Sequence, residues 1–363
     1  MQNLLFDIAP LLETHWTGIP VYTARLARLL LDDPKIEPVF FVHGRLIETK
    51  QVLRSLDAMT GLYLRNDYER DRLPAVLRRS RIDKALFPSV KSMYAIAPSE
   101  ASVVHDLTTI ITPEYHDSAN IEFHRNNLLR EIESNDIVFA TSMATADDIS
   151  YYLDVPHEKI KVAHQFVDWP AEFNLNFESR YPRDLSLPYV LVIGTIEPRK
   201  NLRLVLEAIK EILAIDPELK IVIMGKVGWR LNDALAGDVD SFVAQGRLKF
   251  AGFVDEFKKY CLIRSCRFTI FPSLMEGFGI PVLESFDLGK PVLASFSSSI
   301  PEVGQEAAVY FDPLSKQDFV RGFHKLYDKV MNDPDLTKSN ALNVAAKFTP
   351  ENFFKPFRSW ILK

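Results

Sequence analysis

The sequence predicts an α/β protein built from two doubly wound domains, each with a parallel sheet that helices cover on both faces. The chain has 363 residues, which is more than one domain usually holds. Short apolar runs alternate with segments of helical period through nearly the whole chain, as in parallel sheets with crossover helices. A polar, proline-bearing stretch over residues 170–188 separates two rounds of this alternation and is expected to be a linker.

The first round contains six apolar runs and two amphipathic segments. Apolar residues at Tyr22 and at positions four, seven and eight residues later predict one helix, and a second is expected over about residues 120–134. We expect a first domain over residues 1–175. Its expected strands are Asn3–Asp7, Pro38–His43, Lys84–Pro88, Ser102–His105, Asp136–Thr141 and Ile160–His164.

The second round resumes at Tyr189 and is expected to form a second domain over residues 186–348. Its clearest helix is Leu202–Leu213, whose apolar side chains form one stripe. In doubly wound sheets ligands bind beyond the carboxyl ends of the strands, so the residues after each strand are the candidates for function. The expected strands are Val190–Gly194, Lys220–Met224, Leu248–Phe250, Phe268–Phe271, Val292–Ala294 and Ala308–Phe311.

Composition excludes several classes of protein. Lys and Arg number 43 against 48 Asp and Glu, a net charge of −5, so no nucleic-acid partner is expected. Cys261 and Cys266 are too few for a disulfide framework, and eight scattered histidines without an HExxH motif predict no metal site. The first residues, MQNLLFDIAP, do not resemble a signal peptide, and no apolar run approaches the ~18 residues of a membrane span, so a cytoplasmic protein is expected. No GxGxxG follows the first strand, which disfavours nicotinamide and flavin cofactors.

Two adjacent cations follow the first strand of the second domain. That strand ends at Gly194 and leads through TIEP to Arg199 and Lys200, and Asn201 is placed to cap the next helix. Arg supplies a planar fork and Lys a point charge beside a helix N-terminus, a combination that suits a diphosphate. The dipeptide alone is equally compatible with a solvated basic turn.

A second motif follows the strand that ends at Phe271. The segment E-GFGIPVL-E places Glu276 and Glu284 eight residues apart, with a glycine-bearing turn and the start of a helix between them. The backbone amides of residues 277–280 have no hydrogen-bond acceptor within the helix and are expected to face sugar hydroxyls or phosphate oxygens. An isolated Glu in a first turn usually complements the helix dipole, whereas a pair around GFGIP is far more specific.

These motifs resemble the signature of glycosyltransferase family 4. Matching segments follow in the same order: GTIEPRKN at 194–201, IMGKVGW at 223–229, FAGFVD at 250–255 and SSSIPEVGQEAAVYFDP at 297–313. TGIPVYTARL at 17–26 and VVHDLTTIITPEYH at 103–116 are similar to the family's glycine loop and acceptor-side loop. The resemblance implies the GT-B architecture of two Rossmann-like domains facing a central cleft, with a last helix, about residues 349–363, packing back on the first domain.

The resemblance also implies roles for single residues. Arg199 and Lys200 would bind the donor diphosphate. Glu276 would hold hydroxyls of the transferred sugar, and Glu284 would bind the ribose.

In the first domain, the resemblance implies that His105 faces the sugar near its anomeric carbon, with Asp106 toward the acceptor. It implies that Gly18 lets its loop approach the diphosphate closely. The other implied donor contacts come from Gly194, Lys226, Phe253, Gly277, Phe278, Gly279 and Ile280.

The implied reaction transfers a sugar from a nucleotide sugar with retention at the anomeric carbon and without a metal or other cofactor. GKxGW and HDL…PEYH look most like the mannosyltransferase-type members, which favours GDP-mannose, while UDP- and dTDP-sugars stay open. The implied acceptor is a growing, lipid-linked surface polysaccharide. An epimerase or phosphorylase of the same architecture is one alternative, and a non-catalytic scaffold that binds nucleotide or glycan is another.

Three further features bear on the interpretation. Pro20 stands where the family's N-terminal loop often has a glycine, which bears on acceptor choice. Asp238 and Asp240 spell a DxD in a helix-like region, where a metal site is not expected. The arginine-rich segment 65–81 is either a docking surface for anionic lipid at the inner face of the cytoplasmic membrane or a solvated helix face neutralised by its acidic neighbours.

Overall fold

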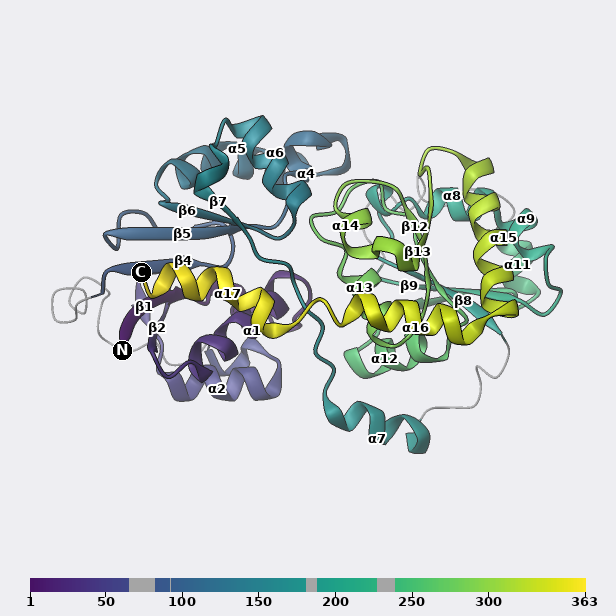
Figure 1. The fold of residues 1–363 in the computed structure, drawn as a ribbon, viewed down its shortest axis with the longest axis horizontal. Helices are drawn as coiled ribbons and strands as arrows, with labels where there is room; N and C mark the ends of the chain where they lie inside the picture. The colour runs from purple at the N-terminus through teal and green to yellow at the C-terminus, as the bar shows by residue number, and fades with distance from the viewer. Residues whose placement is uncertain (65–81, 92, 181–187, 227–238) are drawn as a thin grey trace. The chain divides into compact units, whose positions relative to one another are not determined.

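The computed structural model describes residues 1–64, 82–91, 93–180, 188–226 and 239–363. These residues form two compact units: unit 1 contains residues 1–165 and 350–363, and unit 2 contains residues 166–349. Each unit has its own, almost wholly parallel sheet with helices packed on it, so the predicted α/β class is confirmed (Figure 1). No helix within the described residues is long and apolar enough to cross a bilayer.

Unit 1 contains a seven-stranded sheet in the order β3-β2-β1-β4-β5-β6-β7. Neighbouring strands are parallel except β2 and β3, which form an antiparallel edge. Every apolar run that the sequence indicates in this half overlaps a strand, whereas the two-residue β3 has no apolar pattern. The strands are β1 (Gln2–Asp7), β2 (Ile36–Val42), β3 (Arg45–Leu46), β4 (Lys84–Phe87), β5 (Ser99–Val104), β6 (Ile137–Ala140) and β7 (Ile160–Val162).

Helices of unit 1 connect these strands and include both segments expected from periodicity. The α-helices are α1 (Ile19–Asp32), α2 (Thr49–Ala58), α4 (Thr108–Ile111), α5 (Ser118–Glu133), α6 (Met143–Leu153) and α17 (Pro350–Ile361). Short 3-10 turns are η1 (Ala9–Leu12), η2 (Gly61–Leu64), η3 (Pro113–Tyr115) and η4 (His157–Lys159).

The last helix of the chain, α17, packs in unit 1, although it follows all of unit 2 in sequence (Figure 1). Phe357 lies with its ring centroid 4.1 Å from that of Phe139 on β6, and it is fully buried. The guanidinium of Arg358 donates to the buried carboxylate of Asp33 at 2.5 Å. Apolar contact and a charged anchor therefore both hold α17 on unit 1.

Unit 2 contains a six-stranded, fully parallel sheet in the order β10-β9-β8-β11-β12-β13. Counted within the unit, this is the order 3-2-1-4-5-6 of a doubly wound nucleotide-binding sheet. The order reverses between β8 and β11, so the loops after these two strands are where such a sheet binds its ligand. The strands are β8 (Tyr189–Ile193), β9 (Lys220–Met224), β10 (Leu248–Gly252), β11 (Thr269–Phe271), β12 (Val292–Ser295) and β13 (Ala308–Phe311).

Both faces of the unit 2 sheet are buried. Alternate residues of β8 point to opposite faces: Val190 and Val192 pack in one apolar cluster, while Leu191 and Ile193 pack in another. Helices cover both faces, as a parallel sheet requires. They are α7 (Ala171–Arg180), α8 (Leu202–Glu207), α9 (Ile209–Leu213), α11 (Val239–Ala244), α12 (Glu256–Ser265), α13 (Ile280–Asp287), α14 (Ile300–Gly304), α15 (Lys316–Asn332) and α16 (Pro334–Ala345), with the 3-10 turns η6 (Pro198–Lys200) and η7 (Gln305–Ala307).

Two predictions about unit 2 were wrong in detail. Residues 170–188 are not simply a linker, because α7 occupies their first part and its Phe173 and Phe177 lie against Tyr260 of α12. The expected single helix Leu202–Leu213 is divided into α8 and α9 at Ala208, whose φ of −97° and ψ of 3° leave the helical region. Both pieces still pack in one apolar cluster, which explains why periodicity showed one stripe.

We expect Phe357→Ala to lower the free energy of unfolding by about 3–5 kcal/mol, because it removes a fully buried ring and leaves a cavity against Phe139. Urea denaturation measures the loss, with the exposed neighbour variant Ser359→Ala as the control. Equal stability of the two variants would show that α17 is not part of the folding unit.

Candidate active site

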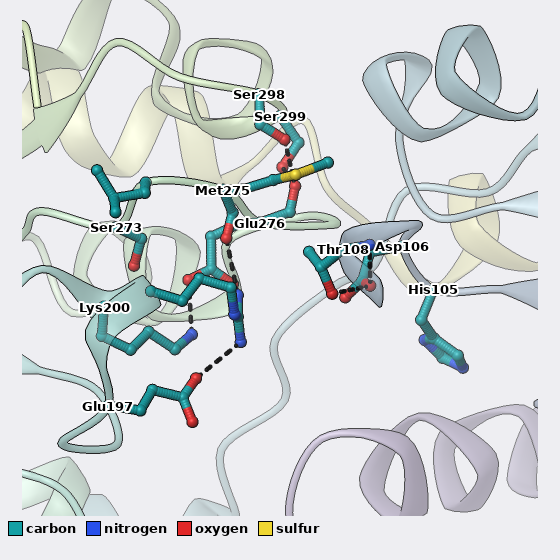
Figure 2. Close-up of polar contacts among 12 residues, drawn as sticks. His105, Asp106, Thr108, Glu197, Lys200, Ser273, Met275, Glu276, Ser298 and Ser299 are labelled. Carbon is teal, nitrogen blue, oxygen red and sulfur yellow. Dashed lines mark hydrogen bonds and ion pairs between the residues drawn. The ribbon is translucent and has the colours of Figure 1, made fainter. Parts of the chain in front are cut away.

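The two motifs singled out in the sequence meet at the carboxyl ends of β8 and β11. Arg199 and Lys200 lie in the turn η6 after β8, and Glu276 lies in the loop after β11. The Lys200 Nζ lies 2.6 Å from Glu276 Oε1, and the Arg199 Nη1 lies 3.3 Å from Oε2 (Figure 2). Each carboxylate oxygen thus faces one cation at the place where the strand order reverses.

Further hydrogen bonds fix the Arg199 side chain between the two loops. Its Nη1 donates to the carbonyl of Met275 at 2.7 Å, and its Nη2 donates to the carboxylate of Glu197 at 3.0 Å (Figure 2). The backbone amide of Leu274 donates in return to the Arg199 carbonyl at 2.8 Å. The guanidinium therefore has a set orientation before any ligand binds.

Two glycines allow the backbone to approach closely beside these cations. A Cβ at Gly225 would lie 1.8 Å from the Gly194 carbonyl oxygen, so only glycine fits after β9. Gly194 has a φ of +154°, and a Cβ there would meet the aliphatic stem of Lys200 at 3.4 Å. Gly194 was expected near the donor; Gly225, within the matched segment IMGKVGW, was not singled out.

Glu276 is held as a carboxylate. Its side chain is only 11% exposed, and burial by itself would raise its pKa, but the charges of Lys200 and Arg199 outweigh burial and lower the pKa to about 2. The hydroxyls of Ser298 and Ser299 donate to the Glu276 carbonyl and fix the backbone (Figure 2). Near neutral pH the side chain can accept hydrogen bonds from hydroxyls, and it has no proton to give.

The turn after Glu276 leads directly into α13. Gly279 adopts a φ of +97° as the residue before the helix, a conformation that favours glycine. Phe278 is 3% exposed and its ring lies 5.8 Å from that of Phe348, so this side chain belongs to the core. Any donor contact of Phe278 must therefore come from its backbone.

Glu284 lies in α13, one turn from its start, and is 5% exposed. Its partner is Lys259 of α12, whose Nζ lies 2.6 Å from Oε1. Sequence reasoning did not find Lys259, because it stands 25 residues upstream in a helix without a recognisable motif.

The remaining expected donor residues of unit 2 lie at the ends of neighbouring strands. Lys226 follows β9 and Phe253 follows β10, and both side chains are exposed, Phe253 by 57%. The cap expected from Asn201 is wrong: its φ of 53° turns the chain between η6 and α8, and its amide instead donates to the Pro313 carbonyl at 2.9 Å. Asn tolerates this left-handed conformation better than most residues.

The expected site residues of unit 1 also follow strands or begin a helix. His105 follows β5, and its Nε2 lies 2.8 Å from the Pro88 carbonyl after β4, which makes that nitrogen the protonated one. Burial lowers the pKa of His105, although that hydrogen bond and Asp106 oppose the shift, so the ring is neutral near pH 7. Asp106 accepts from the backbone amide and hydroxyl of Thr108 at 3.0 and 2.6 Å (Figure 2). Gly18, with a φ of +55°, directly precedes α1.

Some sequence interpretations lie outside the described residues: the segment 65–81, Asp238 and the end of GKVGW. Asp240 is in α11, not after a strand. Among the described residues, no group of three His, Cys, Asp or Glu side chains is placed to hold a metal ion. Burial raises the pKa of Cys261 to about 11 and that of Cys266 to about 12, so both thiols are unreactive packing groups.

The chain is similar in sequence to known glycosyl transferases. Residues 176–343 match the family model described as glycosyl transferases group 1. The serotype-specific mannosyltransferase WbdA of Escherichia coli is 30% identical over 264 residues, which is 69% of this chain and 32% of that protein. The O-antigen chain mannosyltransferase B of Escherichia coli is 28% identical over 222 residues, 58% of this chain and 56% of that protein. The match thus spans between about a third and just over half of these curated relatives.

The fold also matches solved structures. The glycosyltransferase of Rickettsia africae ESF-5 superimposes with a TM-score of 0.68 at 13% identity, covering 100% of this chain and 99% of that one. Two units with parallel sheets and a motif of cations and glutamates at the strand ends define a GT-B protein. Residues 176–343 belong to the group 1 family of glycosyl transferases, also called family 4, as the sequence motifs indicated.

We expect the stability difference between wild type and Glu276→Gln to shrink by about 2 kcal/mol when the pH falls from 5 to 3. A carboxyl with a pKa of about 2 in the folded state, against 4.5 for a glutamate side chain in the unfolded chain, stabilises the fold fully above the higher value. This contribution is lost as the pH falls toward the lower one. Urea denaturation at the two pH values measures it, and a constant difference would contradict the ion pairs.

Proposed function

We propose that this protein transfers a sugar from a nucleotide sugar to a glycan with retention at the anomeric carbon. The observation that supports the proposal is the contact of Arg199 and Lys200 with Glu276 where the strand order of unit 2 reverses. Cations next to an acceptor of sugar hydroxyls are what a diphosphate sugar requires. Family membership supports the same reaction class.

In the proposed reaction, Arg199 and Lys200 bind the diphosphate. Their attraction to the departing phosphate becomes stronger as the bond to the anomeric carbon breaks and negative charge grows on that phosphate. The guanidinium has five donor hydrogens and the ammonium three, so both can hold phosphate oxygens while they keep Glu276. Positive charge supplied by side chains at this point is the basis for proposing a transfer that needs no metal ion.

Glu276 then holds hydroxyls of the transferred sugar and keeps it in register with the diphosphate. Its pKa of about 2 makes it a carboxylate throughout the physiological range, so it is not the acid that protonates a leaving group. We propose that the departing phosphate takes the acceptor proton on the same face of the sugar. That route accounts for retention without a covalent enzyme intermediate.

The rest of unit 2 would bind the nucleoside and the sugar. Glu284 binds the ribose, the amides of residues 277–280 donate to the sugar or the phosphates, and Lys226 and Phe253 border the base and ribose. Gly194 leaves room for Lys200 beside the diphosphate. All these residues follow strands of one parallel sheet, so they share its carboxyl edge.

Unit 1 would supply the acceptor side. The neutral His105 ring, fixed through Nε2 to the Pro88 carbonyl, would contact the sugar near its anomeric carbon, and Asp106 would orient the acceptor. Gly18 leaves open space at its Cα, because a Cβ there would meet nothing within 4 Å, which suits close approach of a diphosphate.

We propose GDP-mannose as the donor and a lipid-linked surface polysaccharide as the acceptor, on the cytoplasmic side of the membrane. Two relatives are named for mannosyl transfer, and one of them for the O-antigen chain. The peripheral membrane contact through segment 65–81 stays a prediction, because these residues lie outside the described ranges.

We expect GDP to stabilise the protein against heat in the presence of a metal chelator, and UDP, ADP and dTDP to do so less. A nucleoside diphosphate at a hundred times its dissociation constant adds about 2.7 kcal/mol to the free energy of unfolding. A thermal-shift screen measures it. Stabilisation by UDP alone would change the donor base, and no shift with any nucleotide would count against the whole proposal.

We expect Glu276→Ala and Arg199→Ala each to lower the rate of mannosyl transfer at least about a hundredfold, since each removes a charged contact to the reacting sugar phosphate. Arg203→Ala is the matched control, because Arg203 is an exposed arginine on α8 that pairs with its own helix neighbour Glu207. Release of GDP from GDP-mannose with a glycan acceptor measures the rate. Full activity in a folded Glu276→Ala protein would overturn the role of this residue.

A further inference from the structure

Lys259 forms the contact that the proposed nucleotide site requires and that no motif indicates. Its ammonium lies 2.6 Å from Glu284 and 2.9 Å from Glu256, one turn earlier on α12. It also lies 5.2 Å from the centre of the Trp169 ring. A lysine between two carboxylates and an aromatic face has little freedom to move.

Burial makes this contact matter. The Glu284 side chain is 6% exposed and the Lys259 side chain 19%. Burial by itself would lower the pKa of Lys259, but the charges of Glu284 and Glu256 outweigh it and raise the pKa, so the ammonium keeps its proton. A buried carboxylate without such a partner would take up a proton instead of staying charged.

The geometry of the carboxylate leaves it able to bind a diol. Lys259 contacts Oε1, and each carboxylate oxygen has two acceptor positions, so both oxygens can still accept from hydroxyls. The two hydroxyls of a ribose are donors side by side, and an ionised, fixed carboxylate accepts both. A protonated carboxyl would lose one of these acceptors.

We propose that Lys259 is the residue that positions the Glu284 carboxylate for binding the ribose diol. The inference rests on the proposed function, in which Glu284 contacts the ribose. Lys259 does not itself touch the nucleotide in this proposal; it acts through Glu284.

Aromatic side chains in and just before α7 pack next to the contact between Lys259 and Glu284. Trp169 precedes α7, and its ring lies 5.4 Å from that of Tyr260, the residue after Lys259. Phe173 of α7 packs on the same tyrosine at 5.6 Å. The helix α7, found where a linker was expected, therefore packs on the part of α12 that carries Lys259.

The test compares the affinity of GDP with that of 2′,3′-dideoxy-GDP by calorimetry. In wild type we expect GDP to bind at least about tenfold more tightly, because two hydrogen bonds to a charged group are lost in the analogue. In Lys259→Met we expect the ratio to fall to within about twofold of one near pH 7. Lys258→Met, the same change at the exposed neighbouring position, should keep the wild-type ratio.

Two further measurements separate positioning from a general structural effect. Lys259→Arg should restore most of the discrimination, because it returns a cation to Glu284. In Lys259→Met the affinity for 2′,3′-dideoxy-GDP should stay within about twofold of the wild-type value, because the lysine acts only through the contact of Glu284 with the diol.

The outcomes are distinguishable. If wild type discriminates between the two ligands and a folded Lys259→Met discriminates equally, the positioning role is overturned and the proposed function stands. If wild type binds both ligands equally well, Glu284 does not bind the ribose, and this inference and that part of the proposed function both fail. If the thermal-shift screen selects another base, the same comparison uses that nucleoside diphosphate and its dideoxy analogue, and failure of wild type to bind any of the four would overturn both.

Discussion

The site depends on one electrostatic constraint. Arg199 and Lys200 are adjacent in a tight turn, so an anion must balance their charges when no ligand is bound. Glu276 supplies it, with one oxygen on each cation. Without that carboxylate, two cations that are only about 15% exposed would repel each other where the loops meet. The same pairing keeps Glu276 charged, so the arrangement that stabilises the empty site also fixes what Glu276 can do chemically.

The topology of the sheet brings these groups together. β8 and β11 are neighbours in unit 2 although their last residues, Ile193 and Phe271, lie 78 positions apart in the sequence. The Leu274 amide donates to the Arg199 carbonyl and so joins the loops that follow these two strands. Parallel strands direct all their carboxyl ends to one edge, and the reversal of strand order leaves space there for a ligand. The close approach of Gly225 to Gly194 completes this edge, since any side chain at that position would collide with the neighbouring strand end.

Sequence patterns located the strands and the motif well, because both depend on local order. A buried parallel strand such as β8 needs an unbroken apolar run, and E-GFGIPVL-E needs its glycines where the backbone turns at Gly279. Contacts between distant segments had no such signal. The helix α7 is stabilised by the contacts of Phe173 and Phe177 with Tyr260. The Asn201 side chain donates to the Pro313 carbonyl and does not cap the next helix.

The two glutamates of the motif could be identified from the sequence, whereas the cation that pairs with one of them could not. Both carboxylates are largely buried, so each needs a cation, and the cations come from different places: a loop 76 residues upstream for Glu276 and the middle of α12 for Glu284. A basic pair after a strand is recognisable, whereas a single lysine in a helix is not. The difference also divides the functions proposed for the two sites. Arg199 and Lys200 lie at a strand end where a phosphate can bind, while Lys259 is held between two carboxylates and the Trp169 ring and stays with Glu284. Glu276 and its partners are therefore suited to a group whose charge changes during the reaction, and Glu284 with Lys259 to one whose charge does not.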